Sequence, residues 1–356
     1  MTRVLVTGGA GFVGSNFCKL YKERNPSWEV VAFDNLRRRG SEINLSDFAK
    51  RGIRFVHGDI RHLSDLQDID GRFDIMIEAS AEPSVHAGIG GGTDYLFDTN
   101  LSGTRNALEY ARRSCDNVVF LSTSRVYSID PLRNLPLSEG TTRLEYTGSE
   151  RIVGISARGI DESFETRLPR SFYGASKLAS ELLIQEYVFH HKLKAVVNRC
   201  GVIAGPGQFG KVDQGVFTLW VARHLWQGTL SYTGFGGKGL QVRDLLHPRD
   251  LFDLVESQVS SIEKYSGEIF NVGGGPDDGS VSLLELSRLC EKETGNALSI
   301  KSIPETNPVD IPWYISDFSR AHACFGWTPK TKVPEIVSEI SNWLKANEAL
   351  LKPLFA

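Results

Sequence analysis

Short apolar runs alternate with segments of helical spacing along the first 200 residues. Buried strands are predicted at residues 3–8, 29–35, 53–59, 72–80, 117–124 and 195–203. Helices are predicted at residues 12–23, 100–113 and 174–190. Strands that alternate with helices build a parallel sheet covered on both faces and joined by right-handed crossovers. The pattern therefore predicts an α/β fold with a doubly wound parallel Rossmann sheet.

The regular pattern loosens after about residue 200. Glycine, proline and aromatic residues become dense, and helical spacing returns at 282–294 and 333–347. We expect a first domain over 1–200 and a smaller C-terminal α/β region over 201–356, which binds the substrate and is interleaved with the first domain. Residues 128–172 predict a long polar insertion with little regular structure, either functional or a mobile surface loop. The residues from Asn347 onward predict a weakly ordered tail.

Composition narrows the class of protein. The chain has 356 residues, 41% of them hydrophobic, and a formal charge of −3, so it lacks the basic excess that holds nucleic acid. Its five cysteines form no CxxC pair, which favours a reduced, cytoplasmic protein over a disulfide scaffold or a metal site. No stretch approaches the about 20 apolar residues of a membrane span. We expect no membrane partner and no metal.

The stretch TGGAGFVG lies between the first strand and the first helix. Gly8, Gly11 and Gly14 are spaced by three, and Gly9 completes a G-x-G-x-x-G match. In that context Gly8 allows a tight turn, Gly11 leaves room for a pyrophosphate, and Gly14 lets the helix approach the strand. The helix N-terminus then offers N–H groups to the anion. The alternative is a turn without a ligand.

Asp34 follows Gly14 by twenty residues, at the end of the second predicted strand. A carboxylate there accepts hydrogen bonds from ribose hydroxyls and repels a 2′-phosphate, which favours NAD over NADP. The run of three arginines over 37–39 is the opposing signal, since it could hold that phosphate. We expect these arginines in a solvated loop, or, for Arg38, near the adenosine half of the cofactor.

Tyr173 and Lys177 lie four residues apart in YGASK, on one face of a predicted helix. A lysine ammonium and a cationic nicotinamide lower the pKa of a phenol, so Tyr173 can take a proton from a sugar alcohol as hydride leaves. Thr123 ends the fifth strand and can bond the reacting hydroxyl, with Ser122 and Ser124 as alternatives. An ordinary pair on the helix surface is the other interpretation.

Together these motifs resemble the extended short-chain dehydrogenase/reductase superfamily of NAD-dependent nucleotide-sugar epimerases and dehydratases. They are TGGAGFVG, Asp34, HGDI (57–60), STSRVY, YGASK, QVRDLLH (241–247) and NVGGG (271–275). The resemblance implies catalytic roles for Thr123, Tyr173 and Lys177. It places NAD against Gly8, Gly11, Phe12, Val13, Asp34, Asn35, Arg38, Asp59, Ile60, Ala79, Ser80, Ala81, Tyr173 and Lys177. It places the substrate against Glu82, Ser124, Gln208 and Arg243, with the arginine on the pyrophosphate.

Several positions depart from the family pattern. The usual His-Leu-Ala-Ala-Gln reads Glu78-Ala79-Ser80-Ala81-Glu82, so Glu82 stands where relatives have glutamine. Val202 replaces a substrate-binding asparagine, and Pro312 replaces a late arginine. Dehydratases of the superfamily carry Asp-Glu after the catalytic threonine, where this chain has Ser124 and Arg125. These changes leave the nucleotide and the sugar open.

FDNLRRRG, GIDESFETRLPRSFYGASK, GQFGKVDQG and QVRDLLHPRD lean the resemblance toward 2-epimerases of CDP-linked dideoxyhexoses, which act in polysaccharide biosynthesis. That reaction would pass through a 2-keto sugar and regenerate NAD. A UDP-sugar 4-epimerase is the alternative, followed by a 4,6-dehydratase or a non-catalytic NAD-binding protein. The resemblance also implies a homo-oligomer, either a dimer or a tetramer, formed through the helices near 100–113 and 174–190.

Overall fold

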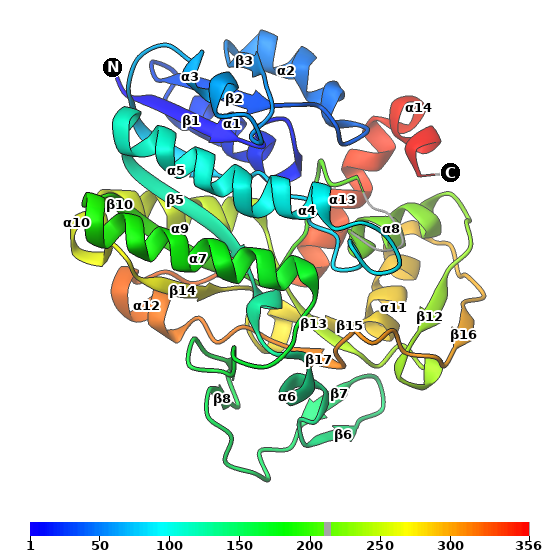
Figure 1. Ribbon diagram of the computed structural model, residues 1–356. Coiled ribbons are helices and arrows are strands. Elements are labelled where there is room, and N and C mark those ends of the chain that lie inside the picture. The colour runs from blue at the N-terminus through cyan, green and yellow to red at the C-terminus, as the bar shows by residue number, and fades with distance from the viewer. Residues whose placement is uncertain (210–214, 356) are drawn as a thin grey trace. The chain divides into compact units, whose positions relative to one another are not determined.

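The computed structural model describes residues 1–209 and 215–355, and these divide into two compact units (Figure 1). The first unit comprises Met1–Val126, Phe172–Arg199 and Leu251–Phe270. The second comprises Tyr127–Ser171, Cys200–Asp250 and Asn271–Ala356. The segment 127–171 thus belongs by its contacts to the second unit.

A seven-stranded sheet in the order β14-β10-β5-β4-β1-β2-β3 forms the centre of the first unit. Neighbours from β5 through β3 pair in parallel, as the alternation of strands and helices predicts. The doubly wound α/β fold is confirmed. The strands are β1 (Arg3–Thr7), β2 (Glu29–Asp34), β3 (Arg54–His57), β4 (Phe73–Glu78), β5 (Cys115–Thr123), β10 (Lys194–Cys200) and β14 (Ile269–Val272).

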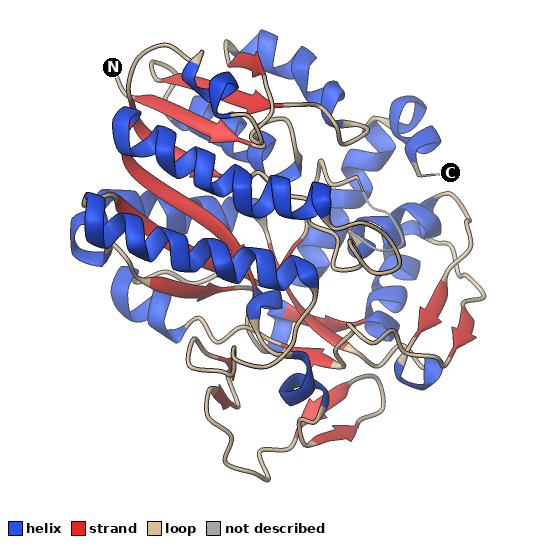
Figure 2. Cartoon of the chain, in the orientation of Figure 1, coloured by secondary structure: helices blue, strands red, loops and turns tan. Residues whose placement is uncertain are grey.

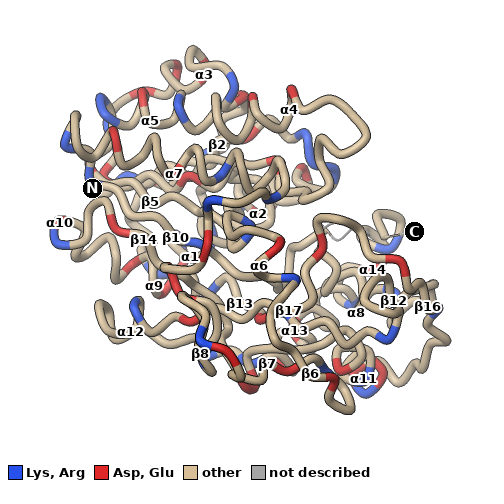
Figure 3. The backbone as a smooth tube through the Cα atoms, turned by 60° about the horizontal axis from the view of Figure 1, so that its bottom comes forward, with Lys and Arg blue, Asp and Glu red and all other residues tan. Residues whose placement is uncertain are grey.

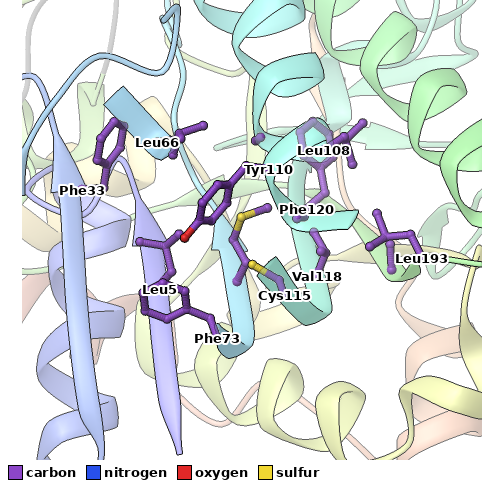
Figure 4. Packing of buried hydrophobic residues seen from close by; sticks show 14 of the residues in the cluster. Leu5, Phe33, Leu66, Phe73, Leu108, Tyr110, Cys115, Val118, Phe120 and Leu193 are labelled. Atoms are coloured by element: carbon purple, nitrogen blue, oxygen red, sulfur yellow. The ribbon is translucent and has the colours of Figure 1, made fainter. Parts of the chain in front are cut away.

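Helices cover both faces of this sheet. On one face, a buried cluster joins the sheet to α5 and α7 through Phe120, Tyr110 and Ile184 (Figure 4). On the other, Phe252 of α9 packs edge-on against Phe17 and Tyr21 of α1. The helices are α1 (Phe12–Arg24), α2 (Asn44–Arg51), α3 (Leu63–Gln67), α4 (Asp94–Phe97), α5 (Gly103–Ser114), α7 (Phe172–His191), α9 (Pro248–Ser260) and α10 (Ile262–Tyr265).

Three short helical turns complete this unit. A π-helical turn (Asp98–Ser102) precedes α5, and 3-10 turns cover Ser41–Ile43 and Ser124–Val126. The last of these begins directly after β5 and packs against α7. It therefore fixes the backbone that follows Thr123.

The second unit has shorter strands and more loop (Figure 2). Its largest sheet is built around β13, which pairs with β11, β15 and β17. The strands are β6 (Leu137–Glu139), β7 (Leu144–Tyr146), β8 (Ile155–Ser156), β9 (Gly159–Ile160), β11 (Val202–Ile203), β12 (Ser231–Thr233), β13 (Val242–Leu246), β15 (Ser280–Ser282), β16 (Lys301–Ile303) and β17 (Trp313–Tyr314).

The helices of the second unit include two long amphipathic ones, α11 and α13, which match the predicted segments. They are α6 (Ile129–Arg133), α8 (Val216–Leu225), α11 (Leu283–Thr294), α12 (Ser319–Phe325), α13 (Val333–Ala346) and α14 (Glu348–Leu351), with 3-10 turns at Phe235–Gly237, Asp277–Gly279 and Lys352–Leu354. Residues 210–214, within the GQFGKVDQG motif, lie outside the described residues.

Three predicted segments need correction. The strand predicted at 195–203 is two strands, because β10 ends at Cys200 and the chain after Gly201 pairs with β13 as β11 instead of continuing in the seven-stranded sheet. The segment 128–172 contains a helix and two short antiparallel strand pairs. The C-terminal residues form α14 and a 3-10 turn, since Leu351 and Phe355 are buried and hold them in place.

Candidate active site

The glycine turn between β1 and α1 has three crowded glycines and one open one. Gly8 has φ +62°, and a Cβ there would lie 2.8 Å from the Ala79 carbonyl oxygen. A Cβ at Gly14 would lie 2.2 Å from the Gly8 carbonyl oxygen, and one at Gly9 2.7 Å from Ala32 Cα. A Cβ at Gly11 would meet only the Gly8 carbonyl oxygen, at 3.1 Å. Apart from this one close contact, no atom lies within 4 Å of that position, so Gly11 is the least crowded of the four glycines and leaves space at the start of α1.

The N-terminus of α1 can accept an anion. Gly11 caps the helix without a side-chain hydrogen bond, and the first turn contains no acidic residue. Phe12 and Val13, the first two helical residues, are half-buried. Their backbone N–H groups lie at the positive end of the helix dipole, where a pyrophosphate is stabilised. The first turn therefore suits a dinucleotide.

Asp34 ends β2 next to this turn. Its carboxylate accepts hydrogen bonds from the backbone N–H groups of Ala10, at 3.1 Å, and Leu36, at 2.8 Å. Burial raises the pKa of Asp34 above its ordinary value, against these hydrogen bonds. The backbone thus holds the carboxylate beside the glycine turn, where it can accept ribose hydroxyls.

Asn35 and Asp59 meet at the carboxyl ends of β2 and β3. The Asn35 amide donates to Asp59 Oδ2 at 3.0 Å, and Arg61 donates to both carboxylate oxygens. Burial would raise the pKa of Asp59, but Arg61 and Asn35 hold it well below its usual range. Ile60 is buried, and its carbonyl accepts from Asn106 at 3.0 Å. Asn35, Asp59 and Ile60 are thus brought together.

Two arginines enclose Tyr95 beside this cluster. The Arg37 guanidinium carbon lies 3.8 Å from the centre of the Tyr95 ring, and that of Arg61 lies 5.0 Å from it. Arg37 is exposed and lies in a loop, as expected, and within that loop it stacks on an aromatic ring. Arg38 is half-buried, and its carbonyl accepts the Ser41 N–H at 3.0 Å.

Thr123, Tyr173 and Lys177 lie on two elements that pack together, β5 and α7. Thr123 is buried, and its hydroxyl oxygen accepts the Arg125 N–H at 3.2 Å. The Lys177 ammonium is buried as well and lies 3.9 Å from the centre of the Phe120 ring. Tyr173 is half-buried one turn earlier on α7. The chemistry these residues can perform is proton transfer next to a buried cation.

Beneath these residues lies an ion pair that the sequence did not indicate. The Ser122 hydroxyl donates to Glu181 Oε1 at 2.5 Å, and Arg199 donates to Glu181 Oε2 at 2.7 Å. All three side chains are buried. This network ties β5, β10 and α7 together and commits the Ser122 hydroxyl to Glu181. Ser124, the other alternative to Thr123, starts the 3-10 turn and is buried.

Glu78 is a second buried carboxylate whose role sequence reasoning missed. It ends β4, is 1% exposed, and accepts a hydrogen bond from the Thr7 hydroxyl through Oε2. Burial raises the pKa of Glu78 to about 7, although Thr7 and the charge of Lys177 act in the opposite direction. The only signal in the sequence was the departure from histidine at this position.

The residues after β4 form a turn against the π-helical turn. Glu82 exchanges backbone hydrogen bonds with the Asn100 amide, at 2.8 and 3.1 Å, and Asn100 also donates to Ser176 of α7. The Glu82 carboxylate accepts the Ser84 N–H at 3.2 Å. Ser80 is buried, while Ala79 and Ala81 are half-buried. The backbone of Ala79 and Ser80 lies beside Gly8, since a Cβ at Gly8 would be 2.8 Å from the Ala79 carbonyl oxygen and 3.0 Å from Ser80 Cα.

Gln208 and Arg243 belong to the second unit. Arg243 of β13 donates to the carbonyls of Val242, at 2.7 Å, and Ile311, at 2.6 Å, and is half-buried. Gln208 donates to the Ile203 carbonyl at 3.0 Å and accepts from Thr218 at 2.8 Å. Hydrogen bonds to these two backbone carbonyls therefore fix the orientation of the Arg243 guanidinium. Substrate binding by these two residues stays a prediction.

The residues of the first unit fit NAD. Gly11 opens the start of α1, the helix dipole faces it, and Asp34 is fixed at the end of β2. Within 1–209 and 215–355, no group of three or more metal-ligating side chains lies close enough to hold an ion. In the same range, no helix is both long and apolar enough to cross a membrane.

A doubly wound sheet with this strand order, a glycine turn and a Tyr–Lys helix beside β5 defines an extended short-chain dehydrogenase/reductase. Enzymes of this class include the NAD-dependent epimerases and dehydratases of nucleotide sugars. Residues 5–340 match the family described as GDP-mannose 4,6 dehydratase, and the chain belongs to that family.

Several relatives are similar over nearly their whole length. The CDP-paratose 2-epimerase of Salmonella typhi is 30% identical over 96% of this chain and 98% of its own. The dTDP-glucose 4,6-dehydratase of Streptomyces niveus is 27% identical over 99% and 95%. The solved dTDP-glucose 4,6-dehydratase of Bacillus anthracis, in complex with NAD, is 25% identical, with a TM-score of 0.75 over 99% and 100%. The resemblance to the superfamily is confirmed.

Proposed function

We propose that this protein is an NAD-dependent epimerase that inverts C2 of a CDP-linked hexose or dideoxyhexose through a 2-keto sugar. Support comes from its likeness to the CDP-paratose 2-epimerase and from the Thr123, Tyr173 and Lys177 set. The same comparison includes dehydratases, so the choice between reaction types rests on the residues themselves.

The observation that carries the choice is the 3-10 turn after β5. Superfamily dehydratases carry Asp-Glu directly after the catalytic threonine, where an acid and a base expel water. Here Ser124 and Arg125 occupy those positions, and the Thr123 hydroxyl accepts the Arg125 N–H. Without the Asp-Glu pair, Thr123, Tyr173 and Lys177 can oxidise and reduce a carbon, whereas elimination would need an acid and a base at other positions.

Tyr173 takes the proton from the sugar hydroxyl and later returns it, and Lys177 stabilises the phenolate. Thr123 bonds the reacting oxygen and holds it near Tyr173. Gly11, Asp34, Asn35 and Asp59 bind the cofactor. NAD held by these residues would supply the hydride chemistry at the ring carbon.

A UDP-sugar 4-epimerase is the second candidate, because the same residues serve whichever carbon faces the nicotinamide. A specific observation keeps it open: Val202 and Pro312 replace two expected substrate-binding residues. A sugar nucleotide different from that of the CDP-paratose 2-epimerase would meet these changes.

The test is a panel of CDP-, UDP-, dTDP- and GDP-linked sugars, incubated with the protein in deuterated and ordinary water and followed by NMR. We expect inversion at C2 of a CDP-sugar without net change in NADH absorbance. Inversion at C4 of a UDP-sugar would select the second candidate, and a 4-keto-6-deoxy product would select a dehydratase. Conversion of no sugar, with NAD still bound, would favour a non-catalytic role.

We also propose that the protein is a cytoplasmic homo-oligomer, a dimer or a tetramer, that serves polysaccharide biosynthesis. α7 supports the oligomer, because it exposes Leu182 and Phe189 (58% and 68%). Charged residues of both signs lie along the neighbouring α5 (Figure 3). Light scattering of wild type and of Leu182→Glu would test it, since a monomeric wild type would contradict the proposal.

A further inference from the structure

Four residues form one row from β1 through β4 and β5 to α7. The strand register pairs Thr7 with Glu78 and Glu78 with Phe120, so these three side chains project from the same face of the sheet. The Lys177 ammonium completes the row above the Phe120 ring, at 3.9 Å from its centre. We call these four residues, Thr7, Glu78, Phe120 and Lys177, the charge row.

The row is dry. Glu78 and Lys177 are each 1% exposed, and Phe120 belongs to the apolar cluster (Figure 4). Glu78 Oε2 accepts from Thr7, and Oε1 has no hydrogen-bond partner within the described residues. The Ser80 N–H nevertheless favours the ionised form of the carboxyl. A buried ammonium without a counter-charge tends to lose its proton. The aromatic face below Lys177 only partly offsets that tendency.

We propose that Glu78 is a positioning residue for the reaction: its buried carboxylate is the counter-charge that keeps Lys177 protonated beside Tyr173. This inference rests on the proposed function, because it assigns Lys177 to catalysis. It adds a residue that acts on Lys177 across the sheet.

The neighbouring charges support this assignment. Lys177 is the charged side chain that acts on Glu78, while Glu181 is neutralised by Arg199. Besides Glu78, the buried titratable side chains on the elements packed around the row are Lys177 and Glu181 on α7, Tyr110 on α5, Cys115 on β5, and Arg199 and Cys200 on β10, and Tyr173 of α7 is half-buried. Because burial raises the pKa of Glu78 to about 7, the counter-charge is present above that pH and absent below it.

The first test is the pH dependence of kcat in Glu78→Gln, using the sugar nucleotide that the panel identifies. Below about pH 6 both proteins carry a neutral side chain at 78, so their kcat values should agree. Above the pKa of Glu78 the variant lacks the counter-charge, and its alkaline limb should move down by about one pH unit, a loss of about tenfold near the limb. An equal loss at every pH, or no loss at any, would overturn the proposal.

A second variant guards against a folding defect in Glu78→Gln. Thr7→Val keeps the carboxyl group and removes its hydrogen-bond donor, which disfavours the ionised form. Its profile should fall between those of wild type and Glu78→Gln, with KM for the sugar nucleotide unchanged. A Thr7→Val profile identical to wild type would count against the charge row.

A third measurement does not depend on the proposed function. Glu78→Gln, Lys177→Met and the double variant form a cycle read by chemical unfolding. We expect a coupling of at least about tenfold in the unfolding equilibrium at about pH 8, and below about twofold at about pH 5, where Glu78 is neutral. No coupling at the higher pH refutes the counter-charge. Coupling in a protein that converts no sugar refutes the proposed function instead.

Discussion

Glu78 in the first unit and Asp244 in the second are both buried carboxylates, but their surroundings differ. Glu78 has one hydroxyl donor and acts on a lysine charge. Asp244 accepts the backbone N–H groups of Ser316, at 3.1 Å, and Gly275, at 3.4 Å. Burial raises the pKa of Asp244 to about 6. One carboxylate thus acts on a side chain of the candidate site, and the other holds loops together.

The glycines around the two carboxylates show the same difference. A Cβ at Gly273 would lie 1.9 Å from Asp244 Oδ2, so the loop closes on the carboxylate itself. In the first unit, Gly8 and Gly14 close on backbone atoms and leave Gly11 open. Close packing of glycines therefore shapes the turn before α1 in the first unit, whereas in the second unit it fixes a loop against the Asp244 carboxylate.

The largest expected effect is on the chemistry assigned to the first unit. Tyr173→Phe removes the proton acceptor and keeps the ring, so kcat should fall by about 10²- to 10⁴-fold with NAD content unchanged. Turnover assays and the NAD released on denaturation measure both quantities. Thr123→Ser is the matched control and should keep most of the activity, because it retains a hydroxyl at position 123. Full activity of Tyr173→Phe would remove the catalytic role of α7.

The next effect separates the crowded glycine from the open one. Gly14→Ala forces a Cβ onto the Gly8 carbonyl oxygen and should destabilise the first unit by about 3 kcal/mol. Gly11→Ala should change stability by less than about 1 kcal/mol, because its φ of −69° suits alanine. Gly11→Ala should still weaken NAD binding at least about tenfold. Calorimetric titration with NAD tests this pair, and unaltered affinity in Gly11→Ala would refute the ligand turn.

Asp244 should show its structural role through pH. Its folded pKa lies above the unfolded value, so its stabilising contribution is full below about pH 4 and is lost as pH rises through about 6. The stability of Asp244→Asn lacks this pH dependence. Its free energy of unfolding should therefore rise relative to that of wild type by about 2–3 kcal/mol as pH increases from about 4 to above about 6. Hydrogen exchange of the Gly275 and Ser316 amides, compared between the variant and wild type at several pH values, measures this stability difference.

Asp244→Ala is the contrasting variant. It leaves both N–H groups without an acceptor, so it should be about 2 kcal/mol less stable than Asp244→Asn at every pH. Equal behaviour of the Asn and Ala variants would show that Asp244 does not staple these loops.

The smallest effect concerns the segment 127–171. Arg143 binds Glu285 at 2.5 Å and Ser280 at 3.1 Å, beside the N-terminus of α11. Both charged side chains are partly exposed, so Arg143→Ala should cost about 1 kcal/mol. Faster hydrogen exchange over 137–146 is the expected readout, and the exposed Arg151→Ala serves as control. Equal exchange in both variants would contradict this contact.

Local features of the chain were predictable. The glycine turn, Asp34 at the end of β2 and the pairing of Tyr173 with Lys177 on α7 depend on a few neighbouring residues and on helix periodicity. The strand alternation predicts the parallel sheet for the same reason. The segment 128–172 and the C-terminal residues were predicted poorly, because tertiary contacts order their polar or short stretches.

The sequence by itself thus determined the sheet, the turn and the helix that carries the tyrosine and lysine, since backbone propensity and side-chain spacing act over short distances. Only the tertiary structure decided which buried groups meet. Strand register sets Glu78 between Thr7 and Phe120, and packing of α7 brings Lys177 and Glu181 against β5. Thr7 and Glu78 are 71 positions apart, and Glu78 and Phe120 are 42 positions apart. Burial and strand register, rather than spacing along the chain, therefore bring these residues together.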